Sequence, residues 1–468
     1  MRKLLRWSAL AVAAGCWFPA GSGFGARPAP DLRDDGAAGS GVGNPPTAFA
    51  GFHVELPPEA RAFPEPLPAG HPNPAFSFRG IKGWDWTPRQ YLEEIPYLSR
   101  FRMNFLMNCY LSLFTSAPGE PLRNEWWKPM TDARRREYAE VIRACREHGI
   151  IFCFAVHPQL ASPRPLNPGS REDLDSLCQH YAWAQGQGVH WFSVCMDDVS
   201  WGADGPAAGG AAHARLANTV LGRLRTADPR ARLIFCPVPY WGDGTEPGHR
   251  AYLNALGGIL HPDVYVFWTG DHVYSPRITR RAAESYRRIV RHRLVLWDNY
   301  PVNDGNPTLH LGPVSGRDPD LCEVVDGYMS NPMRTQNEIN RIPLATCADY
   351  AFNPWLYDPA RSIGQAILHL ADNGAQRRVL KDLVESYPGF IAAGGDSRTN
   401  PVREKFAALR AASGTRPAAA QLAGQVEELD ARLRRDFPGQ FAAAKETVEN
   451  DVAWMNQQLS APSHPDSP

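Results

Sequence analysis

Two adjacent carboxylates, Asp197 and Asp198, stand directly after an apolar run at 190–196 that is typical of a buried strand. Consecutive side chains of a strand begin on opposite faces, so the two groups meet different surroundings unless a turn re-aims one of them. Different surroundings give different pKa values, which lets one carboxylate stay charged while the other works as an acid. Two other interpretations stay open: a helix-capping pair, or two ligands of a Mg²⁺ site that no further carboxylate cluster completes.

Polar and aromatic side chains also end the later apolar runs of the sequence. The segments are Tyr240-Trp241, 268–270, 297–304 and 330–332. Amides, a tyrosine, a carboxylate and aromatic rings at one rim suit a ligand with many hydroxyl groups, because the polar groups pair with hydroxyls and the rings cover apolar faces. Ordinary turn formation is the alternative, since Asn-Pro and Asn-Asp favour turns. Four such segments in register with successive strand ends favour binding.

Eight short apolar runs alternate with longer amphipathic stretches between residues 76 and 357. This alternation predicts a parallel sheet, and eight strands with intervening helices predict an α/β protein with a (β/α)₈ TIM barrel. The chemistry of such a barrel takes place at the C-terminal ends of its strands, where the polar residues above would gather. The strands are predicted within 78–84, 102–110, 150–157, 190–197, 232–240, 263–270, 293–299 and 323–330.

The segments that flank the predicted barrel have other compositions. Residues 1–26 place basic residues before a short apolar run, which predicts an export signal and a periplasmic or extracellular protein; lipid attachment at Cys16 is the alternative processing. Residues 27–75, rich in Pro, Gly and Ala, predict a linker or an arm that wraps the next domain. Apolar stripes at helical spacing predict a C-terminal helical region at 358–460, followed by a disordered tail at 461–468.

Charge and cysteine content narrow the classes of partner and cofactor. Lys+Arg and Asp+Glu are equal at 49 each, so the chain has no excess of positive charge of the kind that favours binding to nucleic acid. No segment is long and apolar enough for an integral membrane span. The nine cysteines form no CxxC pair, so a structural zinc site is not expected, and we predict no metal and no cofactor. Most cysteines are expected to be buried thiols, with a Cys322–Cys347 disulfide left open.

Several segments resemble the family 84 glycoside hydrolases, the β-N-acetylglucosaminidases that include O-GlcNAcases and bacterial hyaluronidase-like enzymes. The resemblance covers about residues 76–355, and its most specific element is Trp297-Asp298-Asn299 followed by Asn303-Asp304. The other matching segments are 79–80, 103–104, 192–198, 235–240, 268–270, 311–313 and 330–332. The resemblance implies a (β/α)₈ catalytic barrel and a retaining mechanism in which the acetamido oxygen of the substrate attacks the anomeric carbon and forms an oxazoline.

Carried over by position, the resemblance implies two catalytic residues. Asp197 would orient and polarise the acetamido N–H, and Asp198 would be the general acid and then the base for water. Tyr240 would contact the acetamido group, and Trp297 would wall its pocket. The other substrate-binding residues would be Asn299, Asp304 and Asn331, together with Gly80, which at the end of the first strand would let the backbone approach the sugar. The expected partner is a glycan or glycoconjugate that contains N-acetylglucosamine.

The chain departs from the family pattern near its first two strands. The family usually continues the first strand as Glu-Gly-Phe-Tyr-Gly, and after the second it has a lysine that touches the sugar. Here the two stretches are Ile81-Lys82-Gly83-Trp84 and Asn108-Cys109-Tyr110, and one hypothesis is that Lys82 reaches the site instead. Because the aspartate pair is intact, we expect an active N-acetylhexosaminidase. The alternatives are a carbohydrate-binding relative without catalysis and a metal-dependent hydrolase.

Overall fold

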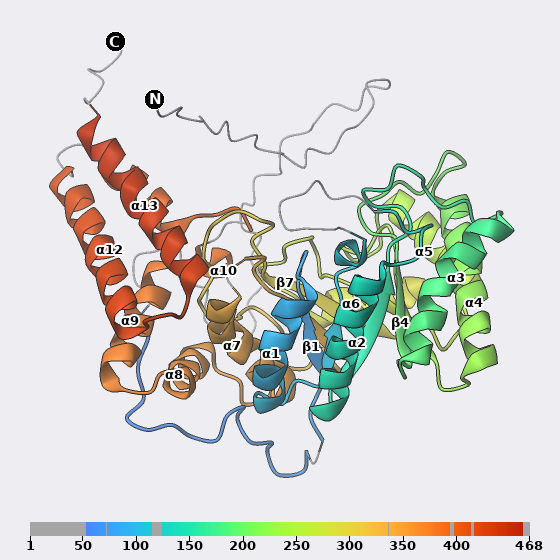
Figure 1. Cartoon of the computed structure of the whole chain (residues 1–468), viewed down its shortest axis with the longest axis horizontal. Helices are drawn as coiled ribbons and strands as arrows, with labels where there is room; N and C mark the ends of the chain where they lie inside the picture. Colours follow the sequence, from blue (N-terminus) through green and yellow to red (C-terminus); the bar gives the residue numbers. More distant parts are fainter. Residues whose placement is uncertain are drawn as a thin grey trace. The chain divides into compact units, whose positions relative to one another are not determined.

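The computed structural model describes residues 53–71, 73–114, 124–335, 337–393, 397–412 and 416–461. Eight parallel strands form a closed barrel in chain order, with β8 hydrogen-bonded to β1 (Figure 1). The strands are β1 Phe78–Lys82, β2 Phe105–Met107, β3 Ile151–Val156, β4 Trp191–Cys195, β5 Arg232–Cys236, β6 Tyr265–Trp268, β7 Leu294–Pro301 and β8 Val325–Asn331. The predicted (β/α)₈ fold is confirmed, since each strand overlaps one predicted segment.

Helices between the strands, and α7 after the last strand, cover the outside of the barrel (Figure 1). Their bounds are α1 Pro88–Arg100, α2 Asp132–Glu147, α3 Arg171–Gly186, α4 Pro206–Ala227, α5 Pro247–Ile259, α6 Arg280–Val290 and α7 Arg341–Phe352. Short 3₁₀ helices occur at η1 Leu111–Leu113, η2 Leu321–Glu323 and η3 Glu338–Asn340. In α2, the Thr131 side chain accepts from the backbone N–H of Arg134 and caps the helix, while the apolar stripe that begins at Tyr138 is buried.

Each strand contributes alternate side chains to two different cores. The barrel interior contains Phe78, Phe105, Cys153, Cys195, Ile234, Phe267, Val295, Trp297 and Met329. The opposite faces, with residues such as Ile81, Val194 and Leu296, pack against the surrounding helices. Because side chains alternate with a period of two, the face of a residue beyond a strand follows from the strand itself. Asp197, two residues after Cys195, therefore continues the inward series of β4.

The C-terminal helices share a second apolar core. They are α8 Pro359–Leu370, α9 Gly374–Ser386, α11 Pro401–Ala411, α12 Arg416–Asp436 and α13 Ala442–Ser460, whereas the short α10 Phe390–Ala393 packs through Phe390 against the core around the barrel. This core also includes Leu309 and Leu311 from the loop that follows β7, and Met333 just after β8. The helical region therefore packs against loops at the C-terminal end of the barrel strands, the end at which the candidate site lies.

The described part of the predicted arm is residues 53–71 and 73–75, and the stretch from 53 to 71 runs along helices α7 to α9. Val54 is fully buried, and its N–H donates to Glu385 Oε1 over 2.7 Å. The Arg61 N–H donates to Gln365 Oε1 over 2.8 Å, so side chains of two helices bind the arm through its backbone. The predicted signal peptide at 1–26, with Cys16, lies outside the described residues, as do 27–52 and all but the first residue of the predicted tail at 461–468.

Three further features bear on function. Among the described residues, no helix has the length and apolar character needed to cross a membrane. The same residues contain no cluster of three or more His, Cys, Asp or Glu side chains that could hold a metal ion. All eight cysteines from Cys109 onward are free thiols, so the Cys322–Cys347 disulfide left open by the sequence does not form. Cys347 is buried in α7, whereas Cys322 lies in η2 and is half-buried.

Candidate active site

The two adjacent aspartates point in different directions at the end of β4. Asp197 is buried, with 6% of its surface exposed, and its Oδ2 accepts a hydrogen bond of 2.5 Å from the Tyr110 hydroxyl. Asp198 has a left-handed backbone conformation, φ 57°, which non-glycine residues rarely adopt. This turn brings its carboxylate to Tyr240, whose hydroxyl donates to Asp198 Oδ1 over 2.8 Å. The helix-capping alternative is wrong, because the next helix begins at Pro206 and its N-cap is Gly205.

The backbone of Asp197 is held by a buried histidine at the end of β3. His157 Nδ1 accepts from the N–H groups of Leu160 and Gln159, at 3.0 and 3.3 Å. An Nδ1 that accepts leaves the ring proton on Nε2, which donates to the Asp197 carbonyl oxygen over 2.8 Å. Burial lowers the pKa of His157, so the ring is neutral at physiological pH. His157 therefore positions the turn between the two carboxylates rather than exchanging protons.

The surroundings of Asp198 favour its protonated form. Partial desolvation, followed by the charge of Asp197, raises the pKa of Asp198 to about 6, although its side chain still reaches solvent. The hydrogen bond from Tyr240 and the charge of Lys82 oppose this rise, and the charge of Asp304 adds to it. Burial also raises the pKa of Tyr240, so the phenol keeps its proton and donates at neutral pH. Asp198 can thus lose and regain a proton close to physiological pH.

Lys82 lies at the same end of the barrel, with its ammonium group among three aromatic rings. Its Nζ is 4.3 Å from the ring centroid of Trp297, 4.5 Å from that of Trp84 and 4.8 Å from that of Tyr110. These distances are typical of cation–π contacts. The residue is fully buried, and its Nζ makes no hydrogen bond with the described parts of the chain. The ammonium of Lys82 and the carboxylate of Asp197 therefore share the Tyr110 side chain as a neighbour.

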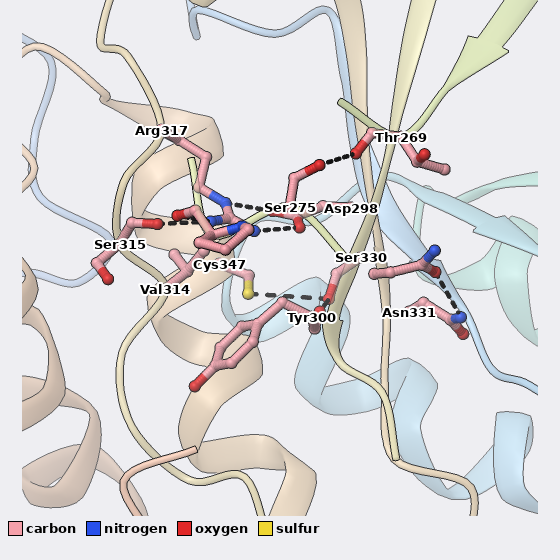
Figure 2. Close-up of polar contacts among 12 residues, drawn as sticks. Thr269, Ser275, Asp298, Tyr300, Val314, Ser315, Arg317, Ser330, Asn331 and Cys347 are labelled. Atoms are coloured by element: carbon pink, nitrogen blue, oxygen red, sulfur yellow. Dashed lines mark hydrogen bonds and ion pairs between the residues drawn. The ribbon is translucent and has the colours of Figure 1, made fainter. Parts of the chain in front are cut away.

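Strands β7 and β8 add aromatic and amide groups to this end of the barrel. Asn331 Nδ2 donates to Asn299 Oδ1 over 2.9 Å, and Asn299 Nδ2 donates to the Val273 carbonyl over 2.8 Å (Figure 2 shows Asn331). Trp297 is buried, with its ring edge-to-face against Phe267. Trp297 Nε1 and Asn331 Oδ1 are buried and bond to no group in the described residues. The structure thus brings Trp297, Asn299 and Asn331 together on neighbouring strands.

Asp304 and Gly80 have other surroundings. Asp304 lies in the loop after β7, where its Oδ2 accepts a 3.0 Å hydrogen bond from Ser397 Oγ of the C-terminal region. The prediction that Gly80 ends its strand is wrong: it is the third of five residues in β1 and pairs with Phe105 and Met329. A Cβ at this position would lie 1.6 Å from the Phe105 carbonyl oxygen. The close approach of β2 accounts for this glycine.

Asp298 stands between two site residues but faces the opposite side of β7 (Figure 2). Its oxygens accept from Arg317 over 2.9 and 2.6 Å and from the Tyr328 hydroxyl over 2.9 Å. The side chains of this ion pair are only 2% and 1% exposed. Ser330 Oγ donates to the Tyr300 carbonyl on the same side. This cluster supports the strand ends that carry Trp297 and Asn331 and does not form part of the site.

Sequence reasoning missed Tyr110 and His157. Both lie just beyond strands, Tyr110 after β2 and His157 directly after β3, at the same end of the barrel as the aspartates. The rule that selected Tyr240 and Asn331 applies to them equally, and the apolar runs predicted for those strands ended at these two residues. Lys82, which the sequence put forward only as a hypothesis, lies beside them.

Comparison with known proteins agrees with this geometry. Residues 80–385 match the sequence profile of the beta-N-acetylglucosaminidase family. The Protein O-GlcNAcases of Rattus norvegicus and Mus musculus are each 27% identical to this chain over 283 residues, which are 58% of this chain and 29% of the relative. The chain therefore spans less than a third of the length of these curated relatives.

Two solved structures resemble the chain. The O-GlcNAc hydrolase of Thermobaculum terrenum superposes with a TM-score of 0.66 at 25% identity and covers 82% of this chain and 84% of that one. CpGH84B, at 22% identity, has a TM-score of 0.63 over 83% of this chain and 68% of that one, and shares the fold. The family profile covers seven of the eight strands in full as well as both aspartates, and the chain belongs to the β-N-acetylglucosaminidase family.

Proposed function

We propose that this protein hydrolyses terminal β-N-acetylhexosaminides in glycans or glycoconjugates that contain N-acetylglucosamine. Configuration is retained, and the reaction proceeds by substrate assistance through an oxazoline. The observation that carries the proposal is the contrast within the aspartate pair. Asp197 is buried with its Oδ1 accepting no hydrogen bond from the described residues, whereas Asp198 is open to solvent with a pKa of about 6. Two carboxylates in different environments suit two different tasks.

In the first step, the acetamido oxygen of the substrate attacks C1 while the glycosidic C1–O bond breaks. Protonated Asp198 donates its proton to the departing oxygen. Asp197 Oδ1 accepts the acetamido N–H, which increases the nucleophilicity of the acyl oxygen and stabilises the positive charge that develops on the ring. An intramolecular nucleophile held in place has a large effective molarity. Tyr110 and His157 serve this step by holding Asp197.

In the second step, water opens the oxazoline. Asp198, now a carboxylate, takes a proton from the water as the oxygen attacks C1 and the bond from C1 to the acyl oxygen breaks. The proton on the oxazoline nitrogen, held by Asp197, restores the acetamido N–H. Two displacements at C1 leave the product in its original β configuration. The same carboxyl group acts first as acid and then as base, for which a pKa near 6 is suitable.

The test is hydrolysis of 4-nitrophenyl N-acetyl-β-glucosaminide, followed by NMR of the first-formed sugar. We expect release of nitrophenol, a β product, and rates that fall as the N-acyl group carries more fluorine atoms, because fluorine weakens the acyl oxygen as a nucleophile. Sugar binding without turnover would instead support the non-catalytic alternative. Loss of activity in EDTA would support the metal-dependent one. Rates independent of fluorination would contradict substrate assistance.

We also propose that residues 1–26 direct export and that the enzyme acts outside the cytoplasm. The order of basic and then apolar residues supports this proposal. Expression of the full chain in a bacterium, followed by cell fractionation and intact-mass measurement, would test it. A periplasmic product that lacks residues 1–26 is expected; a lipid on Cys16 would indicate the alternative processing, and a full-length cytoplasmic product would refute export.

A further inference from the structure

We propose that Lys82 binds the 3-hydroxyl of the sugar and so selects substrates in which that oxygen is unsubstituted. The proposal rests on the function proposed above, because it uses the positions that Asp197 and Asp198 take around the sugar ring. It gives a specific sugar contact to Lys82, the last residue of β1, which the sequence put forward only as a residue that reaches the site. The hydrogen-bonding state of the Lys82 ammonium is the first observation that supports it.

The ammonium of Lys82 is buried without a hydrogen-bond acceptor. The side chain is 0% exposed, and its Nζ bonds to none of the described residues. The rings of Trp84, Tyr110 and Trp297 stabilise its charge but cannot accept its three N–H groups as an oxygen would. A buried ammonium in this state destabilises the fold, so its retention calls for a ligand that supplies the acceptor.

The lysine has matching neighbours at the same end of the barrel. Asp197 Oδ1 and Asn331 Oδ1 are buried acceptors, and Trp297 Nε1 is a buried donor, all without hydrogen bonds to the described residues. With Lys82 Nζ they make two donors and two acceptors, carried by β1, β7, β8 and the end of β4. A sugar hydroxyl both donates and accepts, so a polyhydroxylated ring can satisfy all four atoms. The flexible Lys82 stem, free of hydrogen bonds at its tip, can turn toward such a ligand.

The position of Lys82 relative to the aspartates selects the hydroxyl. Asp198 is directed toward the β5 side of the barrel by its bond with Tyr240. Lys82 lies on β1, across the barrel from β5. Its ammonium group and the Asp197 carboxylate both contact the Tyr110 side chain. Asp197 binds the nitrogen on C2, and Asp198 serves the oxygen on C1. A donor on the other side of Asp197 therefore meets the next ring substituent, which is the 3-hydroxyl.

The experiment compares wild type with Lys82→Met, which keeps the length of the side chain and removes the charge. Calorimetry measures binding of N-acetylglucosamine and of its 3-deoxy and 4-deoxy analogues, and kcat/KM is measured with the corresponding 4-nitrophenyl β-glycosides. Lys128→Met is the matched control, because Lys128 also lies near a tryptophan ring, 6.0 Å from that of Trp127, but is exposed and paired with Glu125. Thermal melting shows whether each variant folds; we expect Lys82→Met to melt no lower than wild type.

For wild type, loss of the 3-hydroxyl should weaken binding roughly 10- to 100-fold, as expected for a hydrogen bond to a charged group. In Lys82→Met the same removal should cost less than about threefold, while the 4-deoxy penalty stays as in wild type. Lys128→Met should behave as wild type throughout.

A full 3-deoxy penalty in Lys82→Met would overturn the proposal, as would loss of the 4-deoxy penalty instead. A shift of the pH profile of kcat/KM in Lys82→Met, with an unchanged 3-deoxy penalty, would show that Lys82 acts only through its charge. This result would also overturn the proposal. Failure of the proposed function gives a different result: wild type would bind the sugars with a 3-deoxy penalty that Lys82→Met removes, yet would hydrolyse none of the glycosides.

Discussion

Two polar clusters, each containing a buried aspartate at the end of a barrel strand, have opposite surroundings. On the outer face of β7, Asp298 accepts two hydrogen bonds from Arg317 and one from Tyr328, and the ion pair is almost fully shielded from solvent. On the inner face of the barrel end, Asp197 accepts one hydrogen bond from Tyr110, and its other oxygen bonds to no described residue. Lys82, whose charge acts on Asp198, lies among aromatic rings instead of beside a carboxylate.

The difference separates stability from function. A buried ion pair whose hydrogen bonds are all made is strongly destabilised when one partner is removed, because the other charge is left unpaired. A buried carboxylate that keeps a free oxygen costs free energy of folding, and a ligand that donates to this oxygen offsets the cost. We therefore expect substitutions in the first cluster to change stability and substitutions in the second to change activity.

The largest expected effect is the loss of activity in Asp198→Asn. Without a proton donor, hydrolysis of glycosides with poor leaving groups should fall by about 10²- to 10⁴-fold, and 4-nitrophenyl glycosides should be affected less because 4-nitrophenolate leaves without protonation. In Asp197→Asn both kinds of substrate should slow, because acetamido attack limits both. A series of aryl glycosides of graded leaving-group pKa measures the difference, and equal losses in the two variants for every leaving group would contradict the assigned roles.

Asp298→Asn should give the converse result. The substitution leaves the buried Arg317 guanidinium without its counter-charge, which typically costs about 3–5 kcal/mol of unfolding free energy. Urea unfolding of Asp298→Asn and Asp197→Asn beside wild type measures the cost. The folded fraction of Asp298→Asn should keep a kcat/KM close to that of wild type. If Asp197→Asn loses as much stability as Asp298→Asn, the two clusters do not differ in the way described.

The fold followed from the sequence because a closed parallel barrel is buried on both faces. Its strands then appear as nearly continuous apolar runs, and each of the eight runs proved to contain or overlap a strand. The ends were less well predicted: β7 continues to Pro301 and β8 to Asn331, where a register shift lets Pro301 pair with Asn331. Such a shift depends on the partner strand, which the local sequence does not encode.

Residue types at strand ends were enough to put forward candidate site residues, and the same rule would have found Tyr110 and His157, whereas contacts across the barrel could not be predicted. Because side chains alternate between the two faces of a strand, the sequence already places Trp297 and Asn299 on one face of β7 and Asp298 on the other, which faces outward. The rings around Lys82 come from three separate segments of the chain, 82–84, 110 and 297, so no local pattern shows them. Gly80 was placed at the end of its strand but lies in the middle, where the close approach of Phe105 from β2 requires a glycine, and its predicted contact with the sugar stays a prediction.

A smaller effect is expected from Tyr240→Phe on the pH dependence. An acid that must be protonated gives a kcat/KM that is constant below its pKa and falls as the pH rises through it, so the alkaline limb of wild type should lie near pH 6. Tyr240 donates to the ionised form of Asp198 and holds its pKa down. Its removal should move the limb to higher pH by up to about one unit.

The control for Tyr240→Phe is Tyr286→Phe. The Tyr286 hydroxyl is also buried and donates to the Pro239 carbonyl of the same loop, over 2.8 Å, without touching Asp198. This variant should be somewhat less stable but should keep the limb of wild type. A limb that moves equally in both variants, or to lower pH in Tyr240→Phe, would mean that Asp198 is not the group that titrates.

The smallest effect is expected at the contact between the helical region and the barrel. Ser397 is buried, and its hydroxyl donates to Asp304, the carboxylate predicted to bind sugar hydroxyls. Ser397→Ala removes one hydrogen bond between side chains, worth about 0.5–1.5 kcal/mol, so KM should rise roughly two- to tenfold with kcat and the pH profile unchanged. Ser460→Ala, which removes a solvent-exposed hydroxyl bonded only to the Asn456 carbonyl, is the control and should have no effect. A change in kcat would show that Asp304 acts on the transition state, and Asp304 would then belong with the aspartate pair rather than with the groups that only bind the sugar.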